Sequence, residues 1–139
     1  MNSTALFDQS QQADDGVDID VRRLDLNRLK YLHTGTPDAE MSTAEWDIAE
    51  LEYRRFLTLK RLYPGMTLIP TKAADNLWRA HILDTRAYRS DCHKVFGRFI
   101  DRYPYFGIYG EEDQREMEHA QAHTARLYER HFGAIFGSA

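Results

Sequence analysis

The spacing of apolar residues between positions 43 and 63 constrains the fold of this chain more than any other feature. Side chains recur there at intervals of three and four residues, which is the period of one face of an α-helix. This stripe consists of Trp46, Ala49, Tyr53, Phe56, Leu57 and Lys60. Ser42 and Glu45 offer a capping box before it, and Pro64 and Gly65 stop the pattern. The sequence therefore predicts one long helix that places its aromatic stripe in the core.

Four further segments show the helical period. They are Asp20–His33, a run from Pro70 to Ile82, a run from Thr85 to Phe99, and residues 111–132. We expect a junction at Asp84, which acts either as a helix cap or as a kink. No stretch shows the two-residue period of β-branched side chains that a strand would need. The expected fold is all-α, a compact single-domain bundle of about five helices.

The composition sets outer limits on the class of protein. The 139 residues include 42% apolar and 12% aromatic side chains, enough for one domain with a buried core. The longest apolar runs are only a few residues, whereas a helix that spans a bilayer needs about 20. Cys92 is the only cysteine, which excludes an intramolecular disulfide and fits a reducing compartment. We therefore expect a cytoplasmic protein that does not bind a membrane.

Charge is distributed unevenly along the chain. Residues 1–20 contain five aspartates and no base, and few of their side chains are apolar. We therefore predict a disordered acidic tail at residues 1–16 and a helical domain at residues 17–139. Residues 54–102 hold eleven bases and four acids. These bases either pair with acids across helix surfaces or form a patch for an anionic partner, and the sequence leaves both alternatives open.

The residues that could carry chemistry gather in the middle of the chain. They are Asp75, Trp78, His81, Asp84, Asp91, Cys92 and His93. Imidazole, carboxylate and thiolate are ligands that zinc accepts, although neither a CxxC pair nor an HExxH motif is present. In the alternative, His81 and Cys92 are buried, and Asp75 and Asp84 serve as caps. We predict that the His81 ring lies between Trp78 and Asp84 and hydrogen-bonds to Asp84 or to a free carbonyl at the helix junction.

A longer pattern over residues 43–107 is similar to a known family. It includes the string Asp-x-x-Trp-x-x-His-x-Leu-Asp-Thr-x-x-Tyr from Asp75 to Tyr88, then Asp91-Cys92, and Tyr103-Pro104-Tyr105-Phe106-Gly107. On these residues the chain resembles the glycine-rich domain-containing protein-like family. The resemblance implies a helical fold and no specific activity.

Two positions depart from the pattern of that family. The resemblance leads us to expect Trp-His-x-His at positions 78–81, and here Arg79 takes the place of the first histidine. Arg102 takes the place of a histidine that often precedes Tyr-Pro in that family. Arginine remains protonated and does not coordinate metals, so any metal that relatives hold through those histidines would lose ligands here. Both replacements instead add positive charge to the basic middle of the chain.

Two hypotheses of different classes follow. In the first, the protein is a non-enzymatic helical interaction module without a cofactor, and a basic and aromatic central surface binds a protein partner, expected to be acidic. The residues assigned to that surface are Asp75, Trp78, Arg79, His81, Asp84 and Arg102. The alternative is a metal-binding or metal-dependent catalytic domain that uses His81, Asp84 and Cys92. Nucleic acid is the disfavoured partner, because the isoelectric point near 5.8 lacks a strongly basic footprint.

Overall fold

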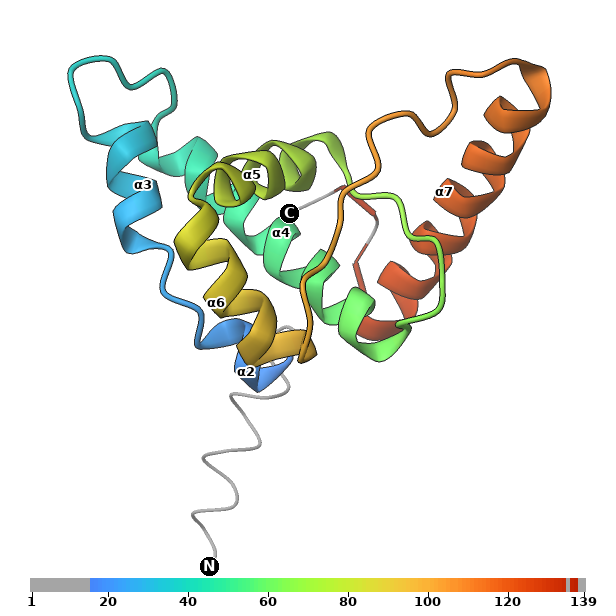
Figure 1. The fold of residues 1–139 in the computed structure, drawn as a ribbon, viewed down its shortest axis with the longest axis horizontal. Helices are drawn as coiled ribbons and strands as arrows, with labels where there is room; N and C mark the ends of the chain where they lie inside the picture. The colour runs from blue at the N-terminus through green and yellow to red at the C-terminus, as the bar shows by residue number, and fades with distance from the viewer. Residues whose placement is uncertain (1–15, 135, 138–139) are drawn as a thin grey trace, which may run out of the picture.

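The computed structural model describes residues 16–134 and 136–137, and this part of the chain is helical without any strand. Its helices, labelled as in Figure 1, are α2 (Ile19–Arg22), α3 (Asn27–Thr34), α4 (Thr43–Leu62), α5 (Lys72–Leu83), α6 (Thr85–Phe96) and α7 (Glu111–Phe132). The expected all-α single-domain fold is confirmed. The expected acidic tail at residues 1–16 lies outside the described residues, apart from Gly16. No helix in the described ranges is long and apolar enough to cross a bilayer.

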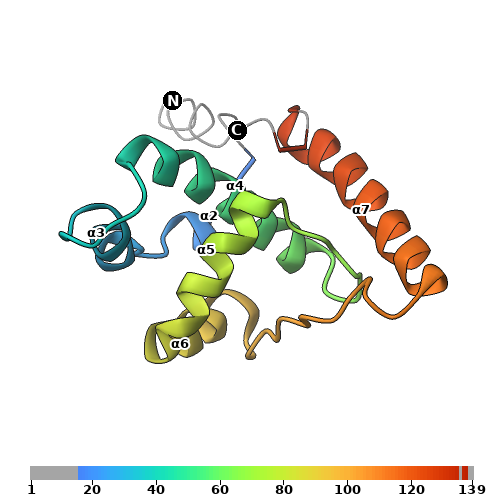
Figure 2. The ribbon, with the colours of Figure 1, turned by 90° about the horizontal axis from the view of Figure 1, so that it is seen from above.

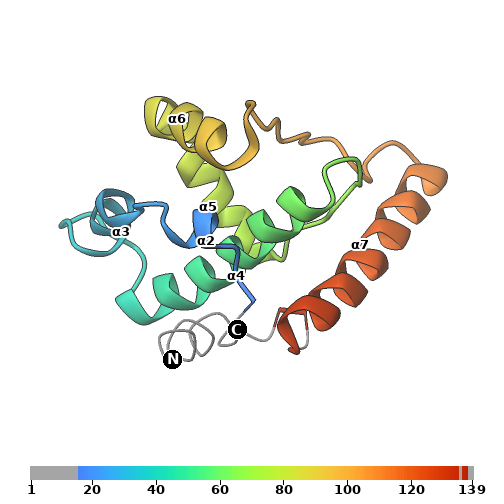
Figure 3. The same ribbon diagram turned by 90° about the horizontal axis from the view of Figure 1, so that it is seen from below.

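Helix α4 lies at the centre of the molecule. It packs against α2, α3, α5 and α7, and Figures 2 and 3 show it between the α5–α6 pair on one side and α7 on the other. The predicted capping box is present, because the Ser42 hydroxyl accepts from the Glu45 amide and the Glu45 carboxylate accepts from the Ser42 amide. The long central helix is therefore confirmed, and it ends at Leu62 before Pro64.

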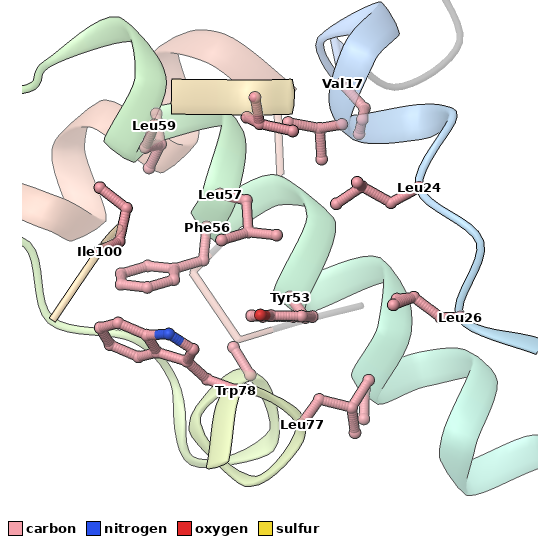
Figure 4. Packing of buried hydrophobic residues seen from close by; sticks show 14 of the residues in the cluster. Val17, Leu24, Leu26, Tyr53, Phe56, Leu57, Leu59, Leu77, Trp78 and Ile100 are labelled. Atoms are coloured by element: carbon pink, nitrogen blue, oxygen red, sulfur yellow. The ribbon is translucent and has the colours of Figure 1, made fainter. Parts of the chain in front are cut away.

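The core forms where the aromatic stripe of α4 meets α5 and the N-terminal segment. Figure 4 shows Tyr53, Phe56 and Leu57 directed into this cluster, with Trp78 beside Phe56. The Phe56 and Trp78 ring centroids are 5.1 Å apart. The largest fully buried side chains include four aromatic residues from three helices. They are Trp46 and Tyr53 on α4, Tyr88 on α6 and Tyr128 on α7. Burial of large aromatic side chains is the main stabilising contribution in such a core.

The segment expected to form one helix from Asp20 to His33 forms two, α2 and α3. At the break, the guanidinium of Arg54 on α4 donates to the carbonyl oxygens of Val21 at 2.7 Å and Leu24 at 3.0 Å. The Val21 carbonyl also accepts from the Leu24 amide at 3.2 Å. Arg54 thus supplies donors for carbonyls at the end of α2, a tertiary contact that the apolar period alone does not reveal.

Helices α5 and α6 meet at Asp84. Its side chain accepts from the Ala87 amide at 3.4 Å and caps α6, so the predicted junction is a cap. Helix α6 ends at Gly97, whose φ of 72° lies in the left-handed region that favours glycine. The expected run to Phe99 is therefore three residues too long, and residues 97–110 form an extended connection to α7 (Figure 1).

Helix α7 is held to the rest of the molecule mainly near its C-terminal end. Tyr128 accepts a hydrogen bond from the Arg55 guanidinium at 2.6 Å, and His131 Nε2 lies 2.6 Å from the Tyr63 hydroxyl. Gly16 packs there as well, since an added Cβ would lie 2.4 Å from the His131 carbonyl oxygen. The other end of α7 reaches away from the bundle (Figures 1 and 3).

Candidate functional site

A groove of about 710 Å³ opens beside the central helix. Its walls come from the end of α4, residues 66–70, the start of α5, residues 101–106 and the start of α7. A volume of this size is typical of ligand or peptide sites. Most of its lining is apolar or aromatic, and its charged side chains are Lys60, Lys72, Asp75, Asp101, Arg102 and Asp113. Three of the predicted binding residues therefore line the same cavity, namely Asp75, Trp78 and Arg102.

Lys60 is the unusual residue of the groove. Its ammonium nitrogen lies 5.5 Å from the ring centroids of both Phe56 and Trp78, an arrangement that allows cation–π attraction. Burial lowers the pKa of Lys60, and the positive charge of Arg98 lowers it further. No carboxylate in the described residues lies within ion-pair distance of Lys60. The groove therefore contains a partly desolvated cation without an anionic partner in that part of the chain.

Asp75 holds the two arginines that replace the expected imidazoles. Arg102 binds its carboxylate with two contacts, 2.7 Å from Nε and 2.8 Å from the terminal nitrogen. Arg79 Nε lies 3.8 Å from the same carboxylate. A two-point contact between guanidinium and carboxylate is directional and strong. Asp75 therefore partly neutralises both cations, and it joins the start of α5 to the segment after α6.

The predicted pairing of His81 with Asp84 is wrong. His81 is 2% exposed, its Nε2 lies 2.8 Å from the Asp91 carboxylate and its Nδ1 lies 2.7 Å from the Tyr53 hydroxyl. Asp84 is exposed and caps α6. The reason is geometric, because the turn at Asp84 folds α6 back so that Asp91, seven residues later, faces His81.

Tyr53, His81 and Asp91 form a buried relay of hydrogen bonds. Burial raises the pKa of Tyr53 well above its ordinary value, so its hydroxyl remains protonated. In the ring tautomer that carries its proton on Nε2, this hydroxyl donates to His81 Nδ1, which lies 2.7 Å away. The other ring nitrogen then donates to Asp91. This arrangement occupies both nitrogens of the imidazole and links α4, α5 and α6.

Cys92 lies apart from any metal-binding arrangement. It is buried, and burial raises the pKa of its thiol, which disfavours the thiolate that metals and nucleophilic catalysis need. Within residues 16–134 and 136–137, no group of three or more histidine, cysteine, aspartate or glutamate side chains is placed to hold a metal ion. The structure therefore does not bring His81, Asp84 and Cys92 together as one ligand set, and His93 is exposed on α6.

An aromatic rim of exposed side chains borders the groove. We define it as Tyr103, Tyr105, Ile108 and Tyr109, which are 64%, 50%, 62% and 68% exposed. Tyr103 also lines the groove. The ring centroids of Tyr103 and Tyr105 are 5.6 Å apart, and those of Tyr105 and Tyr109 are 6.3 Å apart, so the three tyrosines form one cluster. Clustered exposed apolar side chains mark interaction surfaces on soluble proteins.

Two exposed bases of the middle segment, Lys72 and Arg79, lie on α5. Four more lie on and just after α6, namely Arg86, Arg89, Lys94 and Arg98, and we call these four the α6 basic face. None of them forms an ion pair within the described ranges. Arg54, Arg61, Arg79 and Arg102, in contrast, all pair with carboxylates. The first sequence-based alternative, pairing with acids across helix surfaces, therefore holds for the second set of residues, and the patch for an anionic partner stays a prediction for the α6 basic face.

The sequence analysis did not single out Lys60 or the aromatic rim as a site. A signal for Lys60 was present, because it is the one charged member of the apolar stripe on the central helix. A signal for the rim was the density of aromatic residues from Tyr103 to Tyr109. The sequence does not show that the connection between α6 and α7, about forty residues further along the chain, lies beside Lys60.

Comparison with known proteins gives one match. The sequence model of a family described as UCP032817-like matches residues 21–124, about three quarters of the chain. The chain belongs to the UCP032817-like family. The matched range includes every residue that lines the groove, the aromatic rim and the α6 basic face. No curated protein and no solved structure matches the chain. The resemblance to the glycine-rich domain-containing protein-like family stays a prediction.

Proposed function

We propose that this protein is a non-enzymatic interaction module that binds an acidic segment of a protein partner in the groove and against the aromatic rim. The observation that carries the proposal is the aromatic rim, which exposes four large side chains to solvent, one of which, Tyr103, also lines the groove. Tyrosine is enriched at protein interfaces because it offers a large rigid contact area and a polar tip.

The preference for an acidic partner comes from the charges that have no partner in the described residues. Lys60 and the α6 basic face are not neutralised there, and Arg98 is close enough to lower the pKa of Lys60. Unpaired positive charge therefore extends from the α6 basic face to Lys60, in a groove whose lining holds three bases and three acids in all. Such a field accelerates the association of an acidic surface and orients it.

The proposal changes the set of binding residues. Asp75, Trp78 and Arg102 line the groove and stay in it, and Lys60 is added. His81 is left out because it is 2% exposed and both of its ring nitrogens are engaged. Asp84 belongs to a different cavity, between α3 and the end of α5, and Arg79 is exposed and paired with Asp75.

The test is a selection of displayed random peptides on the purified protein, followed by affinity measurements with fluorescein-labelled versions. The rim variant Tyr105→Ser/Tyr109→Ser removes two exposed rings. The matched control is Tyr31→Ser/Leu32→Ser, because these residues on α3 are similarly exposed, at 64% and 57%, and lie outside the groove. Circular dichroism confirms that both variants fold.

We expect selected peptides rich in aspartate and glutamate, and we expect the rim variant to bind them about tenfold more weakly or worse. The α3 control should bind them like the wild type. Equal losses in both double variants, or a selection without acidic residues, would contradict the proposal.

A further inference from the structure

We propose that Lys60 forms a carboxylate-binding subsite, in which its ammonium group receives the side chain of an aspartate or glutamate from the partner. This inference rests on the proposed function and makes it more specific. It names one residue as the point of recognition and one chemical group as what is recognised.

The first step is that no acid of the groove forms an ion pair with Lys60 in the structure. Arg102 holds the Asp75 carboxylate through two contacts. Asp113 accepts from the backbone amides of Gly107 at 2.7 Å and Tyr109 at 3.1 Å, and it fixes the end of the rim. Asp101 also lines the groove and is exposed, but its carboxylate does not lie within ion-pair distance of the Lys60 ammonium. None of the three carboxylates of the groove therefore pairs with Lys60 in the structure.

The second step is that the environment of Lys60 is unfavourable for an isolated cation. The lysine extends from the core stripe of α4, it is only partly exposed to solvent, and its ammonium lies 5.5 Å from the ring centroids of Phe56 and Trp78. Aromatic faces attract a cation but accept no conventional hydrogen bond from it. A carboxylate would supply both charge and hydrogen-bond acceptors, and charge-assisted bonds of this kind are the strongest available to lysine.

The third step concerns what surrounds the subsite. Met66, Phe106 and Met117 line the same groove, and methionine side chains adapt to irregular apolar shapes. A ligand that joins one carboxylate to an apolar neighbour therefore satisfies the lysine and fills the cavity together. In a protein partner this corresponds to an acidic residue next to a large apolar one.

The first experiment uses 3-phenylpropionate and its neutral isostere 3-phenylpropionamide as probes. The four lysines of the chain, which are Lys30, Lys60, Lys72 and Lys94, are reductively methylated with carbon-13 and followed by nuclear magnetic resonance. A Lys60→Arg variant identifies the Lys60 signal. We expect the acid to shift that signal and to raise the pKa of Lys60, and we expect the amide to do neither. Lys94, exposed on α6, provides the internal control.

The second experiment uses the peptides from the selection, each with its acidic residues changed one at a time to the corresponding amide. For the wild type, one such change should weaken binding about tenfold or more. Lys60→Met keeps an unbranched side chain one atom shorter and removes its charge, and in this variant the same change should have no effect. Lys94→Met removes one charge from the α6 basic face outside the groove, so the tenfold difference should persist in it.

The outcomes separate the two proposals. If peptides bind through the rim but acid and amide forms bind equally, or if Lys60→Met preserves the difference, the carboxylate subsite is wrong and the interaction module stands. If 3-phenylpropionate binds at Lys60 while no peptide depends on the rim, the subsite stands as a receptor for a free carboxylate and the protein partner is wrong. If all four lysine signals respond alike to the acid, the subsite is wrong.

Discussion

The Nε2 nitrogen of His81 lies 2.8 Å from the carboxylate of Asp91, and this contact connects α5 to α6. The two side chains are 3% and 13% exposed, so water competes little with the bond. Tyr53 occupies the other ring nitrogen and adds the central helix to the same network. A histidine that looked like a metal ligand is thus placed as a structural link among three helices.

Removal of the imidazole should destabilise the fold. In His81→Ala the Tyr53 hydroxyl and the Asp91 carboxylate both lose a buried partner, which should lower the free energy of unfolding by about 2 kcal/mol or more. Urea denaturation followed by circular dichroism measures the change. His93→Ala, on the exposed face of α6, should stay within about 0.5 kcal/mol of the wild type. A His81→Ala protein as stable as His93→Ala would contradict the structural role.

Trp78 should be a packing anchor as well as a wall of the groove. It is 5% exposed, contacts Phe56, and donates from Nε1 to the Tyr88 hydroxyl at 2.9 Å. Trp78→Ala should therefore cost about 3 to 5 kcal/mol, as expected for truncation of a large core aromatic. Trp78→Phe should cost less, because it keeps most of the volume. A stable Trp78→Ala protein that lacked only partner binding would show that the indole serves recognition alone.

Lys60→Met should fold at least as stably as the wild type at neutral pH. The lowered pKa of Lys60 means that the folded state disfavours the protonated amine, and methionine keeps contact with the rings. As pH rises from the folded pKa toward the ordinary value of 10.5, the unfolded chain binds more protons than the folded one, so the wild type gains stability relative to Lys60→Met. Thermal unfolding of both proteins across this pH range tests the sign. A wild-type advantage that shrinks with rising pH would be contrary to the expectation.

Buried tyrosines should make the fold sensitive to alkali. Burial raises the pKa of Tyr53 and Tyr88 above the ordinary value of 10.0. Above pH 10 the unfolded chain therefore releases protons that the folded chain retains, and stability falls as pH rises. Tyr53→Phe should lower stability near neutral pH, through the lost bond to His81, and should flatten the decline above pH 10. Tyr31→Phe, which removes an exposed hydroxyl on α3, should leave the slope unchanged.

Local sequence patterns predicted the parts of the fold that depend on neighbours in the chain. The capping box at Ser42, the stripe of α4 and the cap at Asp84 each involve groups within four residues of one another, so their spacing is visible without a structure. The helix from Asp20 to His33 was predicted as one piece because its apolar period continues through the break. At that break Arg54, about thirty residues away, donates to carbonyls at the end of α2, a contact that local spacing does not reveal.

In the candidate site, too, some features follow from the sequence and others only from the tertiary structure. The sequence alone determined that the chain is all-α, that Trp78 and Tyr53 belong to buried stripes, and that residues 54–102 carry excess positive charge, because these properties follow from residue type and spacing. Only the tertiary structure decided which charges remain unpaired. Asp75 faces Arg102 across 27 residues of chain, whereas the ammonium of Lys60 faces two aromatic rings, since chain folding and not sequence distance sets which side chains meet.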